Sequence, residues 1–195
     1  MYDCHALEIE ANRRITCLNY KQRAIFDEVV HYATLGLGGF FFVYGHGGTG
    51  KTFLWSTILC KLKSEGRIVL AVASSGIASL LVQGGKTSHS RFRIPIDISE
   101  VSTCEIKKNT HLAELICKAS LVIWDEAPMT HRFVFEAVDR SFRDIRQSIN
   151  PAAGSMPFGG MTVLLGGDFR QVLPVVPKEG REGIMAASIS KSYLW

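Results

Sequence analysis

The sequence has no cysteine pattern that indicates disulfides or zinc. Its five cysteines are odd in number and scattered, with no Cys-x-x-Cys pair and no histidine at zinc-ligand spacing. Disulfide frameworks and structural zinc sites both depend on such spacings. We therefore expect reduced intracellular thiols and no zinc.

Long hydrophobic runs are also absent. The apolar runs, such as Ile68 to Ala73 and Met161 to Leu165, are far shorter than the roughly 20 residues that a membrane-spanning helix needs. Residues 1–14 show neither the apolar stretch of a secretory leader nor the basic, Ser-rich pattern of a mitochondrial one. We expect no membrane-spanning segment.

A strong net charge of either sign is lacking as well. The net charge is +4 and the pI is near 8.8, which is compatible with a polyanionic partner but is not the strongly basic balance of a dedicated nucleic-acid-binding domain. With 47% hydrophobic and 21% charged residues, the composition is that of a folded protein. A chain of 195 residues is long enough for one large domain.

Hydrophobic periodicity predicts helices that alternate with short strands. A helix capped by Asn19 is expected to end at the glycines Gly36, Gly38 and Gly39, and further helices are expected at 52–62, 76–82, 111–118 and 132–147. Buried strands are expected at 40–44, 67–73, 121–124 and 161–165, whereas 83–109 and 150–160 read as irregular. Such alternation predicts an α/β fold with a mainly parallel sheet and helices on both faces.

A glycine-rich segment between the first strand and the next helix fits Gly-x-x-x-x-Gly-Lys-Thr. Backbone N–H groups and a helix N-terminus would bind phosphates there, Lys51 would reach the β- and γ-phosphates, and the Thr52 hydroxyl would bind Mg²⁺. The alternative, a glycine turn without a ligand, is disfavoured by the strand before it and the helix after it. The residues expected to bind ATP in this loop are Gly45, Gly47, Gly48, Thr49, Gly50, Lys51 and Thr52.

Two adjacent acids follow the strand at 121–124. Asp125 can hold Mg²⁺, and Glu126 can act as the general base that activates the attacking water. Two adjacent acids can also be solvated loop residues, but their place after an apolar strand, in a chain with a phosphate loop, favours hydrolysis.

Six short segments resemble, in order and spacing, those of the petite integration frequency (PIF) helicases, which are superfamily-one enzymes. The resemblance extends from about Leu18 to Trp195. The segments are Leu18-Asn-Tyr-Lys-Gln22, the phosphate loop, Ala73-Ser-Ser-Gly-Ile-Ala78, Gly85-Lys-Thr-Ser-His-Ser90, Trp124-Asp-Glu-Ala-Pro-Met129 and Gly166-Gly-Asp-Phe-Arg-Gln171.

The resemblance implies a RecA-like P-loop NTPase domain at 18–195, preceded by an N-terminal extension at 1–17. It implies a DNA helicase that uses ATP and Mg²⁺ to move 5′ to 3′ on single-stranded DNA in repair, recombination and telomere maintenance, in the nucleus or mitochondrion. The family's second motor domain, with its arginine fingers, lies outside these residues. Because such a finger contributes roughly 10³ to 10⁵ in rate, this piece alone should hydrolyse ATP slowly.

The resemblance also assigns two glutamines. Gln22 would recognise the adenine edge, with an exposed helix glutamine as the alternative. Gln171 would sense the γ-phosphate or the attacking water, with Asp168 and Arg170 holding that loop in shape. The family often has an acid where Lys21 stands and a lysine where Met161 stands, and neither position belongs to the expected chemistry.

Two of the segments correspond to family segments that contact DNA. Hydroxyls and backbone N–H groups there would meet phosphates, while His89 or Phe92 would stack on bases. A structural role for His89 and a core position for Phe92 are equally open. The candidate DNA-binding residues are Ser75, Gly76, Thr87, His89 and Phe92.

The helix at 132–147 carries four arginines interleaved with acids, which predicts a solvated, charge-paired face and not a nucleic-acid stripe. Two other functions remain open. A truncated remnant could bind nucleotide or DNA without turnover, although intact Glu126 and Gln171 argue against decay. Another P-loop ATPase, such as a clamp loader or a signalling ATPase, would share the phosphate loop and acids but not the segments at 85–90 and 166–171.

Overall fold

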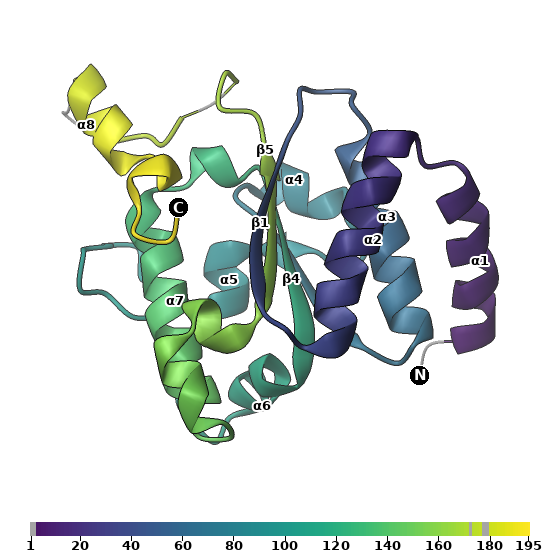
Figure 1. Cartoon of the computed structure of the whole chain (residues 1–195). Helices are drawn as coiled ribbons and strands as arrows, with labels where there is room; N and C mark the ends of the chain where they lie inside the picture. Colours follow the sequence, from purple (N-terminus) through teal and green to yellow (C-terminus); the bar gives the residue numbers. More distant parts are fainter. Residues whose placement is uncertain (1–2, 172, 177–179) are drawn as a thin grey trace.

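A five-stranded parallel sheet forms the centre of the molecule (Figure 1). The computed structural model describes residues 3–171, 173–176 and 180–195. The strand order is β1-β5-β4-β2-β3. The strands are β1 (Gly39–Tyr44), β2 (Ile68–Ala73), β3 (Lys86–Thr87), β4 (Ala119–Asp125) and β5 (Thr162–Gly167).

Helices cover both faces of this sheet, which confirms the predicted α/β architecture. In Figure 1, α1, α2 and α3 lie on one side and α5, α6 and α7 on the other. Short 3-10 turns, η1 to η4, lie at Ala127–Met129, Pro151–Ser155, Pro157–Gly160 and Ile189–Lys191. The helices are α1 (Cys4–Thr16), α2 (Tyr20–Leu35), α3 (Lys51–Ser64), α4 (Gly76–Leu80), α5 (Ser88–Phe92), α6 (His111–Lys118), α7 (Arg132–Arg146) and α8 (Arg181–Ala187).

Side-chain alternation along the central strands builds two separate cores. On β4, Leu121 and Ile123 join the core formed with α2 and α3, whereas Val122 and Trp124 join the core formed with α6 and α7. Successive strand residues point to opposite faces, so a strand between two helical layers must be apolar throughout. This explains why the central strands read as continuous apolar runs.

Helix α2 begins and ends where its sequence predicts. Asn19 accepts a hydrogen bond from the Gln22 N–H at 2.9 Å, and the Gln22 side chain accepts one in return from the Asn19 N–H at 3.1 Å. This reciprocal pair is a capping box. Gly36 ends the helix with φ +65, a left-handed conformation that glycine adopts without strain.

Strand β1 corrects one expectation from the sequence. It was expected to be buried on both faces, but it is the edge strand, its residues from Gly39 to Val43 are only half-buried, and Tyr44 is exposed. An edge strand has a neighbour on one side only, and here that neighbour is β5. The apolar run Phe40 to Val43 does not reveal this, because periodicity reports side-chain burial and not strand order.

The predicted N-terminal extension contains helix α1, which packs against α3. Ala11 is fully buried there, and the Arg14 guanidinium lies 5.7 Å from the centre of the Phe53 ring. The boundary near residue 17 remains a prediction.

The five cysteines form no disulfide. Among the helices of residues 3–171, 173–176 and 180–195, none combines the length and apolar character that crossing a membrane requires.

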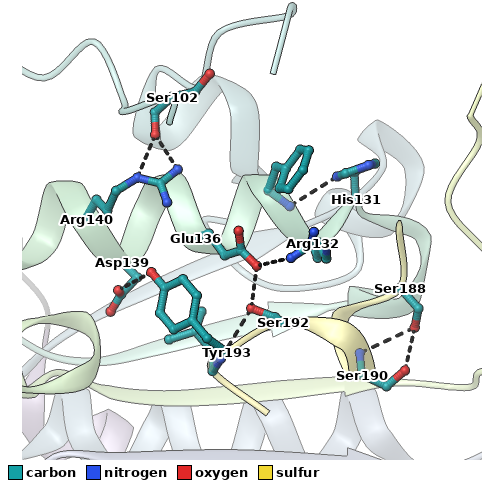
Figure 2. Close-up of polar contacts among 12 residues, drawn as sticks. Ser102, His131, Arg132, Glu136, Asp139, Arg140, Ser188, Ser190, Ser192 and Tyr193 are labelled. Atoms are coloured by element: carbon teal, nitrogen blue, oxygen red, sulfur yellow. Dashed lines mark hydrogen bonds and ion pairs between the residues drawn. The ribbon is translucent and has the colours of Figure 1, made fainter. Parts of the chain in front are cut away.

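Helix α7 corrects a second expectation. Two of its arginines form ion pairs, as predicted, and the acid Asp144 is exposed. The partners of those arginines, Glu136 and Asp139, are buried and not solvated, each 1% exposed. Figure 2 shows Glu136 between Arg132 and the Ser192 hydroxyl, with Asp139 accepting from Tyr193. The C-terminal segment covers this face of the helix and supplies hydroxyl partners to both carboxylates.

Two glycines at the end of β5 let other residues approach closely. A Cβ added to Gly166 would lie 2.3 Å from the Trp55 ring, and one added to Gly167 would lie 2.3 Å from Pro128. Trp55 is fully buried on α3, and Pro128 belongs to η1. The two glycines therefore let Trp55 of α3 and Pro128 of η1 pack against the end of β5.

Gly166→Ala should lower the free energy of unfolding by about 1–3 kcal/mol, because the added methyl group overlaps the buried Trp55 ring. Urea denaturation would measure this. Gly76→Ala is the control, since its added methyl group meets nothing within 4 Å. Equal stability losses in the two variants would contradict the packing argument.

Candidate nucleotide and DNA site

The segments that carry the predicted site residues follow strand ends at one edge of the sheet. In a parallel sheet the carboxyl ends of all strands lie at the same edge, and ligands bind there. The loops that follow β1, β2, β4 and β5 begin at Gly45, Ser74, Glu126 and Asp168 respectively.

The phosphate loop folds around the Lys51 side chain. Gly48 and Gly50 have φ +79 and +80, which other residues rarely adopt. Lys51 opens α3, and its Nζ donates to the carbonyl oxygens of Gly45 and His46. The Thr49 hydroxyl donates to the His46 carbonyl at 2.8 Å. The loop thus encloses the Lys51 ammonium at the N-terminus of α3. A helix N-terminus is a favourable place to bind a phosphate.

Gln22 lies against this loop. Its Nε2 donates to the Thr49 carbonyl at 3.2 Å, while its Oε1 is engaged in the α2 capping box. Beside it is a cavity of about 340 Å³, whose walls include Asn19, Ile25 and Lys51. These bonds leave the Gln22 amide one N–H and one oxygen lone pair for the predicted contact with adenine.

The acid pair lies at the end of β4. Asp125 is 3% exposed and Glu126 is half-buried with φ +52, a left-handed conformation unusual for a residue other than glycine. Burial, followed by the Asp125 carboxylate, raises the pKa of Glu126, while the Lys51 ammonium lowers it. A raised pKa makes a carboxylate a better proton acceptor, as a general base must be.

The residues present fit a magnesium ion bound together with phosphates. The Asp125 Oδ1 atom is buried and has no hydrogen-bond partner among the residues that the structure describes, which is costly unless a ligand completes the site. Thr52 is half-buried in the first turn of α3. Among the described residues no three His, Cys, Asp or Glu side chains cluster as metal ligands, so phosphate oxygens would have to supply the rest.

The segment after β5 is tied to the phosphate loop. Asp168 is buried, and its Oδ2 lies 2.7 Å from His46 Nδ1, while its Oδ1 accepts from the Arg170 N–H at 2.9 Å. Tyr44 adds a hydrogen bond to the same carboxylate. The Gln171 amide faces the loop, with its Nε2 3.4 Å from where a Cβ on Gly47 would lie. Asp168 therefore holds the segment in shape, as predicted.

Asp168→Asn should destabilise the chain at neutral pH, and the effect should shrink as the pH falls below about 4. The Arg170 N–H, with the His46 and Tyr44 hydrogen bonds, lowers the pKa of Asp168 despite its burial. A carboxyl with a lowered folded-state pKa contributes stability above its unfolded pKa and loses it in acid.

Urea denaturation at pH 7 and at pH 3.5 measures this difference. Asp144→Asn, which changes an exposed carboxylate paired with Lys108, is the matched control. A loss in Asp168→Asn that does not depend on pH would rule out the electrostatic explanation.

One serine connects the ends of β2 and β4. The Ser74 Oγ accepts hydrogen bonds from Trp124 Nε1 at 3.2 Å and from the Thr130 hydroxyl at 2.7 Å. The Ser74 N–H donates to the Asp125 carbonyl at 3.1 Å. The residue that precedes the Ser75 cap of α4 is therefore bonded to the strand that carries the acid pair.

Ser74→Ala should cost about 1–3 kcal/mol in unfolding free energy, because two donors, the indole N–H and the Thr130 hydroxyl, lose their acceptor in a buried environment. Thermal and urea unfolding would measure the change. Ser155→Ala is the control, because that hydroxyl makes a single exposed bond to the Ala152 carbonyl. An effect no larger than that of the control would show that Ser74 is not a structural link.

Four of the five candidate DNA-binding residues are at least partly accessible. Ser75 caps α4 and Gly76 is exposed at its start; Thr87 caps α5 and His89 is exposed on it. Partial burial lowers the pKa of His89, so its neutral form is favoured at physiological pH.

The expectation that Phe92 stacks on DNA bases is wrong. It is fully buried, with its ring 5.3 Å from Phe142 and 6.0 Å from Trp124, so the core alternative holds.

Comparison with known proteins identifies the family. The model of the PIF1-like helicase family matches residues 17–195. The chain belongs to the PIF1-like helicase family. The ATP-dependent DNA helicase PIF4 of Trypanosoma brucei brucei is 31% identical over 160 residues, which cover 80% of this chain and 18% of that protein. Human ATP-dependent DNA helicase PIF1 is 29% identical over 135 residues, covering 69% and 20%.

A solved PIF1-like helicase has the same fold. The crystal structure of the Bacteroides Pif1 helicase in complex with ADP-AlF3 and single-stranded DNA matches with a TM-score of 0.72 and 27% identity, covering 91% of this chain and 39% of that one. The present chain thus corresponds to the N-terminal motor region of PIF1-like helicases. It spans about a fifth of the length of the curated relatives it matches.

Sequence reasoning missed three residues of this PIF1-like site. His46 and Tyr44 bind Asp168, and Ser74 joins the strand ends. His46 occupies a variable position of the phosphate-loop motif and Tyr44 closes an apolar run, so neither stands out. Ser74 lies inside a recognised segment, but only its contacts across the sheet reveal its role.

Proposed function

We propose that this chain is the first motor domain of an ATP-dependent DNA helicase that moves 5′ to 3′ on single-stranded DNA. One observation carries the proposal: buried Asp125, one of whose oxygens has no partner among the described residues, adjoins half-buried Glu126, and the pair lies close enough to Lys51 for its charge to act on Glu126. This supports one site that combines a metal ligand, a base and a phosphate-binding cation.

Each predicted residue has a role in that reaction. Lys51 and the loop N–H groups bind the phosphates, while Thr52 and Asp125 would hold Mg²⁺, which would neutralise phosphate charge. Glu126 orients the attacking water and accepts its proton. Gln171, which faces the phosphate loop, senses the γ-phosphate or that water, and Gln22 binds the adenine edge.

The DNA strand would pass over the starts of α4 and α5. Ser75 and Gly76, with Thr87 and His89, offer hydroxyls, N–H groups and an imidazole there. Full activity would need the second motor domain, whose arginine fingers complete the site. A role in DNA repair, recombination and telomere maintenance, in the nucleus or mitochondrion, follows from the family alone.

Lys51→Ala should weaken ATP binding roughly ten- to a hundred-fold, because charge-assisted hydrogen bonds to the phosphates are lost. Glu126→Gln should retain binding and lower hydrolysis roughly 10²- to 10⁴-fold, the usual range for removal of a general base. Binding of a fluorescent ATP analogue and phosphate release with oligo-dT would measure both, with and without a family second motor domain fused in cis.

Lys61→Ala is the matched control, because Lys61 lies on the same helix and pairs with Glu65. The proposal predicts DNA-stimulated turnover in the fused protein that both site variants abolish. ATP binding without any turnover in the fused protein would instead support the non-catalytic remnant.

A further inference from the structure

A second cavity lies where β2 begins, at the opposite end of the strand from the nucleotide site. Its volume is about 420 Å³, and it shares no lining residue with the cavity beside the phosphate loop. Residues from α1, α3, α5 and α6 form its walls together with the first residues of β2. The lining residues are Cys4, Lys63, Gly66, Arg67, Ile68, Val69, Leu70, Arg91 and Leu115.

The charges in this lining have one sign. Lys63, Arg67 and Arg91 contribute three cations, and no lining residue is a carboxylate. The Nε atoms of both arginines are buried and have no hydrogen-bond partner within the described part of the chain. Glu65 is not a lining residue, but its Oε2 lies 3.5 Å from the Arg67 Nε. The Arg67 Nε therefore already faces a carboxylate, whereas a buried guanidinium N–H without an acceptor, as at Arg91, is costly and indicates a missing anion.

Arg91 is the less compensated of the two arginines. Its one hydrogen bond to the protein in this structure goes to the Gly84 carbonyl, at 3.4 Å. Burial lowers the pKa of Arg91, and no carboxylate opposes that shift. An arginine stays protonated in proteins, so this guanidinium remains a half-buried positive charge to which no carboxylate of residues 3–171, 173–176 and 180–195 is paired.

The remaining lining is apolar. Ile68, Leu70 and Leu115 provide aliphatic surface beside the arginines. Strand β3 pairs only with Val72 and Ala73, so the first part of β2 has no strand on this side. A cavity of several hundred Å³ with apolar walls and a few convergent polar groups is typical of a small-molecule site.

We propose that this cavity binds an anionic group, a carboxylate or a phosphate, carried on an apolar body. The forked guanidinium groups of Arg67 and Arg91 match such an anion, because their N–H groups can donate in parallel to two of its oxygens. The aliphatic wall then takes the attached apolar part. The proposal is independent of the proposed helicase activity.

The β2 end of the cavity is separate from the part of the candidate DNA path at α4, whereas Arg91 lies on α5, two residues after His89. Ser75 and Gly76 follow the far end of the strand, which at about 3.3 Å per residue lies roughly 17 Å from Ile68. A bare phosphate backbone would also leave the apolar wall uncovered. Single-stranded DNA is therefore the competing ligand that the experiment must exclude.

Isothermal titration calorimetry of this chain with four eight-carbon probes tests the proposal. Octyl phosphate and octanoate should bind, whereas octanol and octylammonium, which have the same chain and a different head, should bind at least ten-fold more weakly. Arg91→Ala should weaken binding of the two anions roughly ten-fold or more, since hydrogen bonds to charged groups are lost. Arg13→Ala, which changes an exposed arginine on α1, should change nothing.

Arg91→Lys guards against a folding defect, because it keeps the charge and loses the fork, and it should also weaken binding. Hydrogen exchange should show protection by octyl phosphate at the amides of 66–70. Vesicles of phosphatidylglycerol separate two sources of the ligand: co-pelleting that Arg91→Ala abolishes indicates a lipid headgroup, and calorimetric binding without co-pelleting indicates a free ligand.

Three results would overturn the proposal. The first is equal affinity for octanol and octyl phosphate. The second is an equal loss of binding in Arg13→Ala and Arg91→Ala. The third is complete displacement of octyl phosphate by oligo-dT, which would make the cavity part of the DNA path.

Discussion

The parallel direction of the strands is the constraint on which the rest of this structure depends. It forces each strand to be followed by a long crossover, and helices supply these crossovers on both faces. It also brings the carboxyl ends of all strands to one edge. Segments that are far apart in the sequence, from Gly45 to Gln171, meet there only because no strand runs in the other direction.

At that edge, buried polar groups hold one another in place. Asp168 receives hydrogen bonds from the end of β1, from the phosphate loop and from its own segment, so the phosphate loop and the segment after β5 share one anchor. Asp125 differs, because one of its oxygens is buried and unpartnered. The Asp168 carboxylate thus holds the loops in place, whereas the Asp125 carboxylate is available to a ligand.

The sequence predicted the elements that are determined by residues close together in the chain. Helix α6 has the predicted bounds, and α2 begins at the predicted Asn19 cap, because apolar spacing and capping residues are properties of a short segment. The phosphate loop and the acid pair could also be recognised in the sequence, since their chemistry demands particular residues at fixed spacing. Their roles in catalysis remain predictions.

What the sequence could not reveal depends on contacts between distant segments. The edge position of β1 is set by strand order, and the burial of Glu136 and Asp139 is set by the C-terminal segment that folds over α7. Phe92 is in the core because Phe142 and Trp124 surround it, although its segment resembles one that contacts DNA. A motif shows which residues gather at a site, but not which of them face outward.

The Ser74 hydroxyl has a mechanical consequence. It bonds to Trp124 and Thr130, on either side of the acid pair, while its own backbone leads directly into the cap of α4. The start of α4 and the acid pair are therefore coupled directly. A displacement of that helix would reach Asp125 through the hydrogen bond between the Ser74 N–H and the Asp125 carbonyl.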